Sequence, residues 1–205
     1  MTPTTGPMNL VVVSAGLGVP SSSRLLADRI TESVRRELAG TDREVRVTVV
    51  ELRDLAVAIA NNLVTGFPAK PLADAIDVVT GADGLIAVTP VFTASYSGLF
   101  KSFFDLIEPD ALTGKPVLIA ATGGTARHSL VLEHALRPLF AYLRALVVPT
   151  AVYAASEDWG GSGDAMTATL PDRISRAGGE LAALMASRVT DTGHADTATT
   201  ADLFA

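Results

Sequence analysis

Hydroxyl side chains gather in residues 14–24, where a run of apolar residues gives way to a helical pattern. The segment contains Ser14, Ser21, Ser22, Ser23 and Arg24. A turn from a strand into a helix presents free backbone N–H groups and the positive end of the helix dipole, and both favour an anion. The serine hydroxyls and the guanidinium add donors that suit a phosphate group. Serine-rich turns also serve as simple helix caps, so both interpretations stay open from this segment alone.

Two common nucleotide motifs are absent from this segment. Gly16 and Gly18 match the first half of the dinucleotide fingerprint, but Ser21 stands where its third glycine would be. No Gly-Lys-Ser or Gly-Lys-Thr sequence follows, which excludes a nucleoside-triphosphate loop.

A second segment, residues 90–98, combines a proline with aromatic side chains. Pro90 has a fixed φ and would end a strand there, so that backbone N–H and C=O groups point outward. Such an edge, flanked by Phe92, could lie along a flat heteroaromatic ring. The alternative is that Phe92 and Tyr96 make ordinary hydrophobic contacts.

A third segment, Thr122-Gly-Gly-Thr125, also lies between a predicted strand and a predicted helix. Paired glycines leave backbone N–H groups uncovered, and such donors could stabilise a ring that gains negative charge. We expect Gly124 to need a positive φ. A flexible turn is the alternative interpretation.

The elements that position these segments follow from hydrophobic periodicity. Apolar runs predict five strands, at residues 10–14, 44–50, 84–89, 116–121 and 147–154. Four-residue spacing predicts a helix from Ser23, capped by Ser22 or Ser23, and further helices at 72–80, 97–107, 129–143 and from Pro171. Residues 54–70 are expected to form a loop with a short turn, because Gly66, Pro68 and Pro71 interrupt them.

Strands that alternate with helices predict an α/β fold, a three-layer sandwich with a five-stranded parallel sheet in the order 2-1-3-4-5 and helices on both faces. In such sheets a ligand binds beyond the carboxyl ends of the strands, where all three segments would meet. We expect one domain at 9–186, a flexible N-terminus at 1–8 and a mobile tail at 187–205.

Composition narrows the function classes. The chain has 205 residues, of which 48% are apolar and 19% charged, and a formal net charge of -6. This acidic balance speaks against nucleic-acid binding, and no run of residues is apolar enough for a membrane span. The chain contains no cysteine, and its few histidines show no metal-binding pattern, so no catalytic metal is expected. A cytoplasmic protein is expected.

The three segments together resemble the NADPH-dependent FMN reductases of the flavodoxin-like superfamily. The resemblance covers roughly residues 9–155 and is most specific in the sequences at 82–85, 89–101, 121–128 and 135–138. Residues 14–16 with 22–28 are similar to the reductases that partner luciferase-like monooxygenases.

This resemblance implies residue roles. The FMN phosphate would be held by Ser14, Ser21, Ser22, Ser23 and Arg24. The isoalloxazine would be lined by Pro90, Val91, Phe92 and Thr93, with Ser95 as a further cofactor contact, and its N1/O2 edge would face Thr122, Gly123 and Gly124. Many members carry an arginine where Leu17 and Gly18 stand here, and often a tyrosine where Phe92 stands.

The resemblance implies transfer of a hydride from NADPH or NADH to flavin N5, after which reduced FMN leaves for a flavin-dependent monooxygenase. No catalytic side chain is expected, because hydride transfer needs stacking and orientation rather than acid–base chemistry. The alternatives are an FMN-containing quinone or azo reductase, a flavodoxin-type electron carrier, and a flavin-binding regulatory protein.

Three further expectations concern surfaces. We expect a homodimer or homotetramer, with Phe100, Phe104, Leu106 and residues 156–164 at the interface. His128 could touch the flavin or the nicotinamide, but a helix-surface position is favoured. Glu51 could mimic a ribose-binding acid, but an exposed charge at a strand end is favoured. Trp159 could be a lid or an interface anchor.

Overall fold

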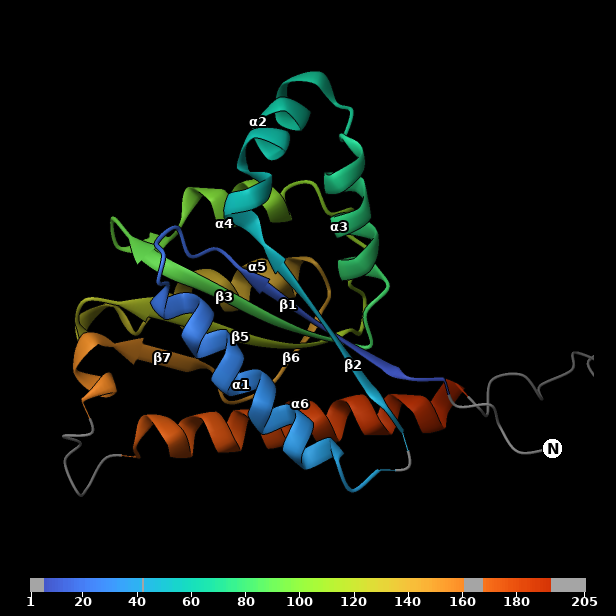
Figure 1. Ribbon diagram of the computed structural model, residues 1–205, viewed down its shortest axis with the longest axis vertical. Helices are drawn as coiled ribbons and strands as arrows, with labels where there is room; N and C mark the ends of the chain where they lie inside the picture. The colour runs from blue at the N-terminus through green and yellow to red at the C-terminus, as the bar shows by residue number, and fades with distance from the viewer. Residues whose placement is uncertain (1–5, 42, 161–167, 193–205) are drawn as a thin grey trace, which may run out of the picture.

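The computed structural model describes residues 6–41, 43–160 and 168–192. Within these residues, seven strands form one sheet. Five of them lie in the order β2-β1-β3-β5-β6, and two further strands pair beside this path, β4 (Ser95–Tyr96) with β3 and β7 with β5. The long parallel strands are β1 (Met8–Ser14), β2 (Val45–Glu51), β3 (Gly84–Phe92) and β5 (Pro116–Gly123). The predicted flavodoxin-like order is confirmed, and Figure 1 shows the sheet between two helical layers.

The predicted fifth strand is divided. β6 (Leu146–Val147) and β7 (Val152–Ala155) pair with successive parts of β5. Pro149 lies between them and has no N–H to donate to a ladder. Thr150 is bound instead to helix α6 (Leu170–Thr192), because its N–H and its hydroxyl both donate to the Glu180 carboxylate, each at 2.7 Å.

Two helices cover one face of the sheet. These are α1 (Ser22–Leu38) and α6 (Leu170–Thr192), which pack Leu26, Ile30, Leu181 and other side chains against β1, β3 and β5. α1 is capped by Ser21, whose Oγ accepts from the N–H of Arg24 at 3.2 Å, rather than by Ser22 or Ser23 as expected. α6 continues six residues past Ala186, and residues 193–205 lie outside the described structure.

The other face is covered by α3 (Lys70–Thr80), α4 (Gly98–Phe104) and α5 (Arg137–Tyr142), preceded by a π-helical turn, η3, at Leu132–Leu136. Aromatic rings in tilted and edge-to-face contact fill this layer: the ring centroid of Phe104 lies 4.7 Å from that of Phe100 and 4.9 Å from that of Phe140.

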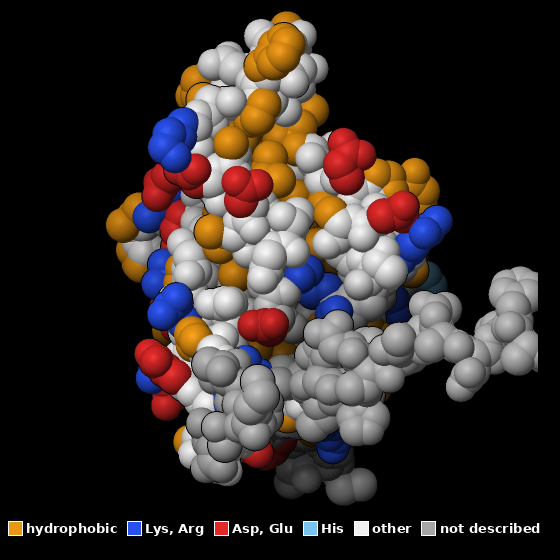
Figure 2. Space-filling view, turned by 90° about the vertical axis from the view of Figure 1, so that its right-hand side faces the viewer, with side chains coloured by type: hydrophobic (Ala, Val, Ile, Leu, Met, Phe, Trp, Pro, Cys, Tyr) orange, Lys and Arg blue, Asp and Glu red, His pale blue; other side chains and the backbone are white. Residues whose placement is uncertain are grey.

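The prediction of a loop at residues 54–70 is wrong. A 3₁₀ turn, η1 (Leu52–Leu55), is followed by helix α2 (Ala56–Thr65). Gly66 and Pro68 mark only the end of α2, where Gly66 has a φ of 77°. Gly66 and Pro68 therefore end a helix, whereas the prediction extended their loop over the whole of residues 54–70. α2 and the start of α3 project beyond the sheet (Figure 1), and Figure 2 shows hydrophobic side chains exposed at that end of the molecule.

One buried cation, Lys115, lies just before β5, at the edge of the sheet opposite to the carboxyl ends of the parallel strands. Lys115 is 6% exposed and donates to the carbonyl oxygen of Ala82. Burial, with a smaller contribution from Arg188, lowers the pKa of Lys115 to about 8. The folded protein therefore binds this proton less tightly than the unfolded chain does, in which a lysine pKa is about 10.4.

Lys115 predicts a pH dependence of stability. Between pH 8 and about 10.4 the unfolded state binds more protons at this site, so its contribution to the free energy of unfolding rises with pH. Relative to Lys115→Met, the wild type should gain about 2–3 kcal/mol from pH 7 to 10.5. Urea denaturation of both proteins at each pH measures this difference. A constant difference would contradict it.

Candidate functional site

A hollow of about 410 Å³ opens at the carboxyl ends of the parallel strands. It brings together most of the predicted site residues, namely Ser21, Ser22, Ser23, Pro90, Val91, Phe92, Thr122, Gly123 and Gly124. The same hollow is lined by residues that were not among the expected cofactor contacts, namely Gly16, Leu17, Gly18, Pro20, Ala154, Ser156 and Trp159, the last of which was expected as a lid or an interface anchor. Among the described lining residues none carries a charge.

Loop one, residues 14–21, presents the start of α1 to this hollow. The Ser21 hydroxyl accepts the capping bond but keeps its own hydrogen free to donate. Gly16 is required here, because a Cβ at this position would lie 2.0 Å from Ser21 Oγ. Ser14 is buried, and its Oγ has no hydrogen-bond partner among the described residues. Unsatisfied donors at a helix N-terminus suit an anion.

Arg24 does not line the hollow, contrary to expectation. Its Nε donates to Asp28 Oδ1 at 2.8 Å and its Nη1 to Glu51 Oε1 at 2.7 Å. These bonds, first to Asp28 and then to Glu51, raise the pKa of Arg24. The Glu51 side chain is only 14% exposed, so it is not the free surface charge that was expected.

The bonds of Arg24 to Asp28 and Glu51 determine what Arg24→Ala should do. Because the guanidinium lies outside the hollow, FMN and riboflavin affinities should fall by similar factors, each below about tenfold. The free energy of unfolding should drop by about 1–3 kcal/mol, since Glu51 would keep a nearly buried charge without its partner. Fluorescence titration with both flavins and urea denaturation measure the two effects. A loss confined to FMN would instead place this side chain on the phosphate.

Arg53 supplies a positive charge at loop one that sequence reasoning missed. It extends from η1, and its Nη1 donates to the carbonyl oxygen of Gly18 at 3.0 Å. The arginine that many similar proteins carry within loop one is absent here, and that absence was a signal for a cation from another segment. Arg53 both fixes the loop and brings a guanidinium to its rim.

Loop two is a hairpin rather than an extended edge. β3 continues past Pro90, which pairs with Thr122 of β5, and reaches Phe92. It then pairs antiparallel with β4 (Ser95–Tyr96). Thr93 and Ala94 form the turn with φ of 49° and 68°, a backbone region that residues other than glycine adopt rarely. Phe92 is 47% exposed beside the hollow, whereas Thr93 and Ser95 lie outside it.

Loop three is fixed by two hydrogen bonds to other parts of the site. Thr122 Oγ1 and Ser23 Oγ share a buried hydrogen bond of 2.8 Å, which joins loop three to α1. Tyr153 Oη donates to the carbonyl oxygen of Thr125 at 2.8 Å. A Cβ at Gly123 would lie 2.0 Å from that Tyr153 oxygen. The positive φ expected at Gly124 is absent, and Gly124 has open space around it.

Trp159 closes one side of the hollow from η4 (Ser156–Trp159). Arg29 of α1 lies over its ring, 5.0 Å from the ring centroid. Arg173 supports the same turn, since it donates to Asp158 and to the carbonyl oxygen of Tyr153, each at 2.6 Å. Trp159 is thus a wall of the hollow. Residues 161–164 of the expected interface lie outside the described structure.

Comparison with known proteins identifies the family. The family model of NADPH-dependent FMN reductases matches residues 8–160. An FMN reductase (NADPH) from Pseudomonas aeruginosa is 39% identical over 155 residues, 76% of this chain and 81% of the relative. The chain belongs to the NADPH-dependent FMN reductase family.

Two further matches agree with this membership. The NADH-dependent FMN reductase SfnE of Pseudomonas putida is 41% identical over 152 residues, 74% of this chain and 79% of the relative. The structure of an oxidoreductase from Corynebacterium diphtheriae is 46% identical and has a TM-score of 0.84, covering 89% of this chain and 99% of that one. The reductase is therefore an NAD(P)H:flavin oxidoreductase that uses FMN with NADPH or NADH.

The residues of the hollow fit FMN. A phosphate finds the α1 N-terminus and the spare Ser21 hydrogen, while Ser14 is fully buried outside the lining and its Oγ has no partner among the described residues. A flat ring finds Phe92 and Trp159 as apolar walls and the uncovered backbone at Gly123 and Gly124 along one edge.

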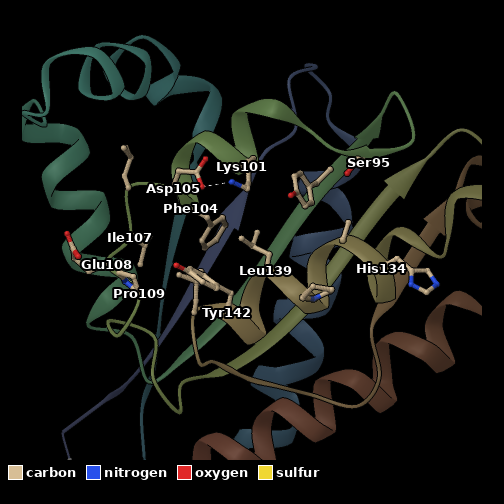
Figure 3. Close-up of a pocket in the computed structure, with 15 residues that line it drawn as sticks. Ser95, Lys101, Phe104, Asp105, Ile107, Glu108, Pro109, His134, Leu139 and Tyr142 are labelled. Atoms are coloured by element: carbon tan, nitrogen blue, oxygen red, sulfur yellow. Dashed lines mark hydrogen bonds and ion pairs between the residues drawn. The ribbon is translucent and has the colours of Figure 1, made fainter.

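A second and larger hollow, of about 810 Å³, lies between α4 and α5 (Figure 3). It contains Ser95, one of the expected cofactor contacts, together with Lys101, Leu106, Leu139 and Tyr142. It lies away from the loop-one helix terminus, and its lysine, Lys101, is paired with Asp105. Ser95 belongs to β4 of the hairpin and lines this larger hollow, not the flavin hollow.

The predicted interface residues are only partly available to a partner. Phe100 and Phe104 are 0% and 1% exposed in the reductase's own core, which contradicts their expected role at an interface. Leu106 is half-buried and lines the larger hollow. His128 is exposed on the 3₁₀ turn η2 (Ala126–His128), a surface position as expected. Within the described residues, no helix is long and apolar enough to cross a membrane.

Proposed function

We propose that this reductase releases reduced FMN to a flavin-dependent monooxygenase rather than keeping it as a prosthetic group. The observation that carries the proposal is the character of the hollow. Its described lining has no charged side chain, and Arg24, the expected clamp, is bound to Asp28 and Glu51. The described lining has no arginine or lysine to form a bidentate or ionic pair with the phosphate, so a site built mainly from neutral donors favours exchange of the flavin.

We assign the binding roles as follows. Ser21, Ser22 and Ser23 hold the phosphate with the first backbone N–H groups of α1, and Arg53 balances its charge from the rim. Phe92 and Trp159 flank the ring, while Pro90, Val91, Thr122, Gly123 and Gly124 border its edge. When bound, FMN supplies the two-electron chemistry by accepting a hydride from the nicotinamide.

The protein's own contribution is orientation and electrostatics. Backbone N–H groups near Gly123 and Gly124 offer hydrogen bonds to a ring edge that becomes more negative on reduction. Walls at Phe92 and Trp159 restrict the ring to one plane, against which a nicotinamide can stack. No side chain of the chain needs to transfer a proton in this step.

The test combines purification and kinetics. We expect the protein to lose most of its flavin on gel filtration and to oxidise NADPH or NADH only when free FMN is added. A yellow protein that stays loaded and reduces quinones would show that the flavin is a prosthetic group. A yellow protein that is inert toward both nicotinamides would indicate an electron carrier.

We also propose a cytoplasmic homo-oligomer. Several apolar side chains lie exposed on the helices and hairpin outside the sheet, including Val64 at 87%, Phe67 at 81% and Tyr142 at 72%. Exposed patches of this kind mark protein interfaces, and Figure 2 shows hydrophobic side chains exposed at the end of the molecule that α2 forms. Light scattering should give at least a dimer at micromolar concentration. A fully active monomer would contradict this.

A further inference from the structure

Beside the flavin hollow lies a smaller hollow of about 290 Å³ on the other side of the β3–β4 turn. Ala94, at the tip of the turn, forms part of its wall, and so do Arg127, His128 and His134. The apolar side chains Leu130 and Val131 complete its lining. His134, labelled in Figure 3, lines both this hollow and the larger one between α4 and α5.

This hollow adjoins the ring end of the flavin site on two segments. Phe92 lines the flavin hollow and Ala94 lines the second one, two residues further along the hairpin. Along loop three, Gly124 lines the flavin hollow and Arg127, three residues further on, lines the second hollow. The Cα atoms of Gly124 and Arg127 therefore lie at most about 11 Å from each other. A ligand that continues past Gly124 by that length reaches Arg127.

The positive charge in this hollow is not neutralised by the protein. Arg127 forms no ion pair and no side-chain hydrogen bond with the residues that the structure describes, whereas six of the thirteen arginines form ion pairs. The carboxylate nearest in sequence, Glu133, is taken up by Arg137 through bonds of 2.6 and 3.0 Å. An arginine without an acidic partner offers its planar set of donors to a phosphate.

The substrate chemistry requires such a place. A nicotinamide that stacks on the flavin carries its diphosphate, and in NADPH also a 2′-phosphate, away from the ring. The described lining of the flavin hollow has no cation to receive these groups. Arg127, His128 and His134 are the side chains that can donate to them at its ring end.

We propose that Arg127, His128 and His134 form a subsite for the phosphate groups of the nicotinamide dinucleotide. The inference rests on the proposed function and deepens it, since it assigns the second substrate to a face of the molecule. Two sources share this chemistry: the 2′-phosphate, found only in NADPH, and the diphosphate, common to NADPH and NADH.

Steady-state kinetics of Arg127→Gln separate the two sources. Loss of a charge-assisted pair predicts a KM for the dinucleotide raised about ten- to a hundredfold, with kcat and FMN affinity unchanged. A rise for NADPH alone places the 2′-phosphate in the hollow, and an equal rise for NADH places the diphosphate there. Arg127→Lys should retain part of the affinity. The matched control is Arg36→Gln, in the last turn of α1, away from the site.

Calorimetry gives a readout that does not depend on turnover. Adenosine 2′,5′-bisphosphate and ADP, titrated into wild type and Arg127→Gln, report the 2′-phosphate and the diphosphate separately. If Arg127→Gln and the double variant His128→Ala/His134→Ala both keep KM and binding within twofold of wild type, the subsite is refuted. If wild type does not oxidise either nicotinamide with FMN, the proposed function fails, while the binding titrations still decide the subsite.

Discussion

Gly16→Val is expected to weaken FMN binding by about a hundredfold or more while the protein stays folded. The new side chain would occupy the position of Ser21 Oγ, since even a Cβ lies 2.0 Å from it, and the Cβ of Ser23 is 3.2 Å away. Displacing Ser21 removes both the α1 cap and a phosphate donor. Hydrogen bonds to a charged group contribute about 1.5–3 kcal/mol each, or roughly ten- to a hundredfold in affinity.

Fluorescence titration with FMN and with riboflavin distinguishes this effect from general damage. Riboflavin has no phosphate, so its affinity should fall by less than about tenfold. Gly40→Val is a suitable control, because Gly40 has open space around it. Ser21→Ala should reproduce part of the loss without added bulk. Equal losses for both flavins in a folded Gly16→Val protein would mean that loop one does not hold the phosphate.

Gly123→Ala is expected to slow flavin reduction at least tenfold, whereas Gly124→Ala should behave like the wild type. At Gly123 the new methyl group meets Tyr153 Oη at 2.0 Å, and Tyr153 is only 4% exposed, so it has little room to move. The displacement would break the bond from Tyr153 to Thr125 that shapes the ring edge. Gly124 has no neighbour within 4 Å. Stopped-flow bleaching of FMN by NADPH compares the two variants.

A second substitution tests the cause. Tyr153→Phe removes the oxygen that collides with the new methyl group, so the double variant Gly123→Ala/Tyr153→Phe should recover part of the rate. Recovery stays partial because Tyr153 Cζ lies 3.0 Å from the added Cβ. If Gly124→Ala is as slow as Gly123→Ala, the ring edge is controlled by something other than this contact.

The sheet and the meeting of three loops were predictable because they depend on patterns that a sequence displays directly. Apolar runs mark buried parallel strands, and parallel strands bring their carboxyl ends to one edge. The division of β6 from β7 was also visible in principle, since Pro149 cannot donate to a ladder.

Side-chain direction could not be read in the same way. Arg24 has Asp28 one helical turn away and Glu51 at the end of the neighbouring strand, and only the folded arrangement shows that both carboxylates reach it. For Trp159 the sequence left a lid and an interface anchor open, because only the folded arrangement shows its ring against Arg29 of α1 and beside the hollow. Gly124 was misjudged because its pairing with Gly123 suggested a conformation that the backbone does not adopt.

The uncharged lining of the flavin hollow also affects how each substrate arrives. The lining offers an anionic flavin no cation, and Arg53 at its rim is paired with Asp54. The net charge of -6 therefore repels the flavin, and added salt should speed its association by screening that repulsion. A dinucleotide drawn toward Arg127 would instead approach more slowly as salt screens that cation. Added salt should thus slow entry of the reductant and speed entry of the flavin, so that the order of encounter depends on the surrounding medium.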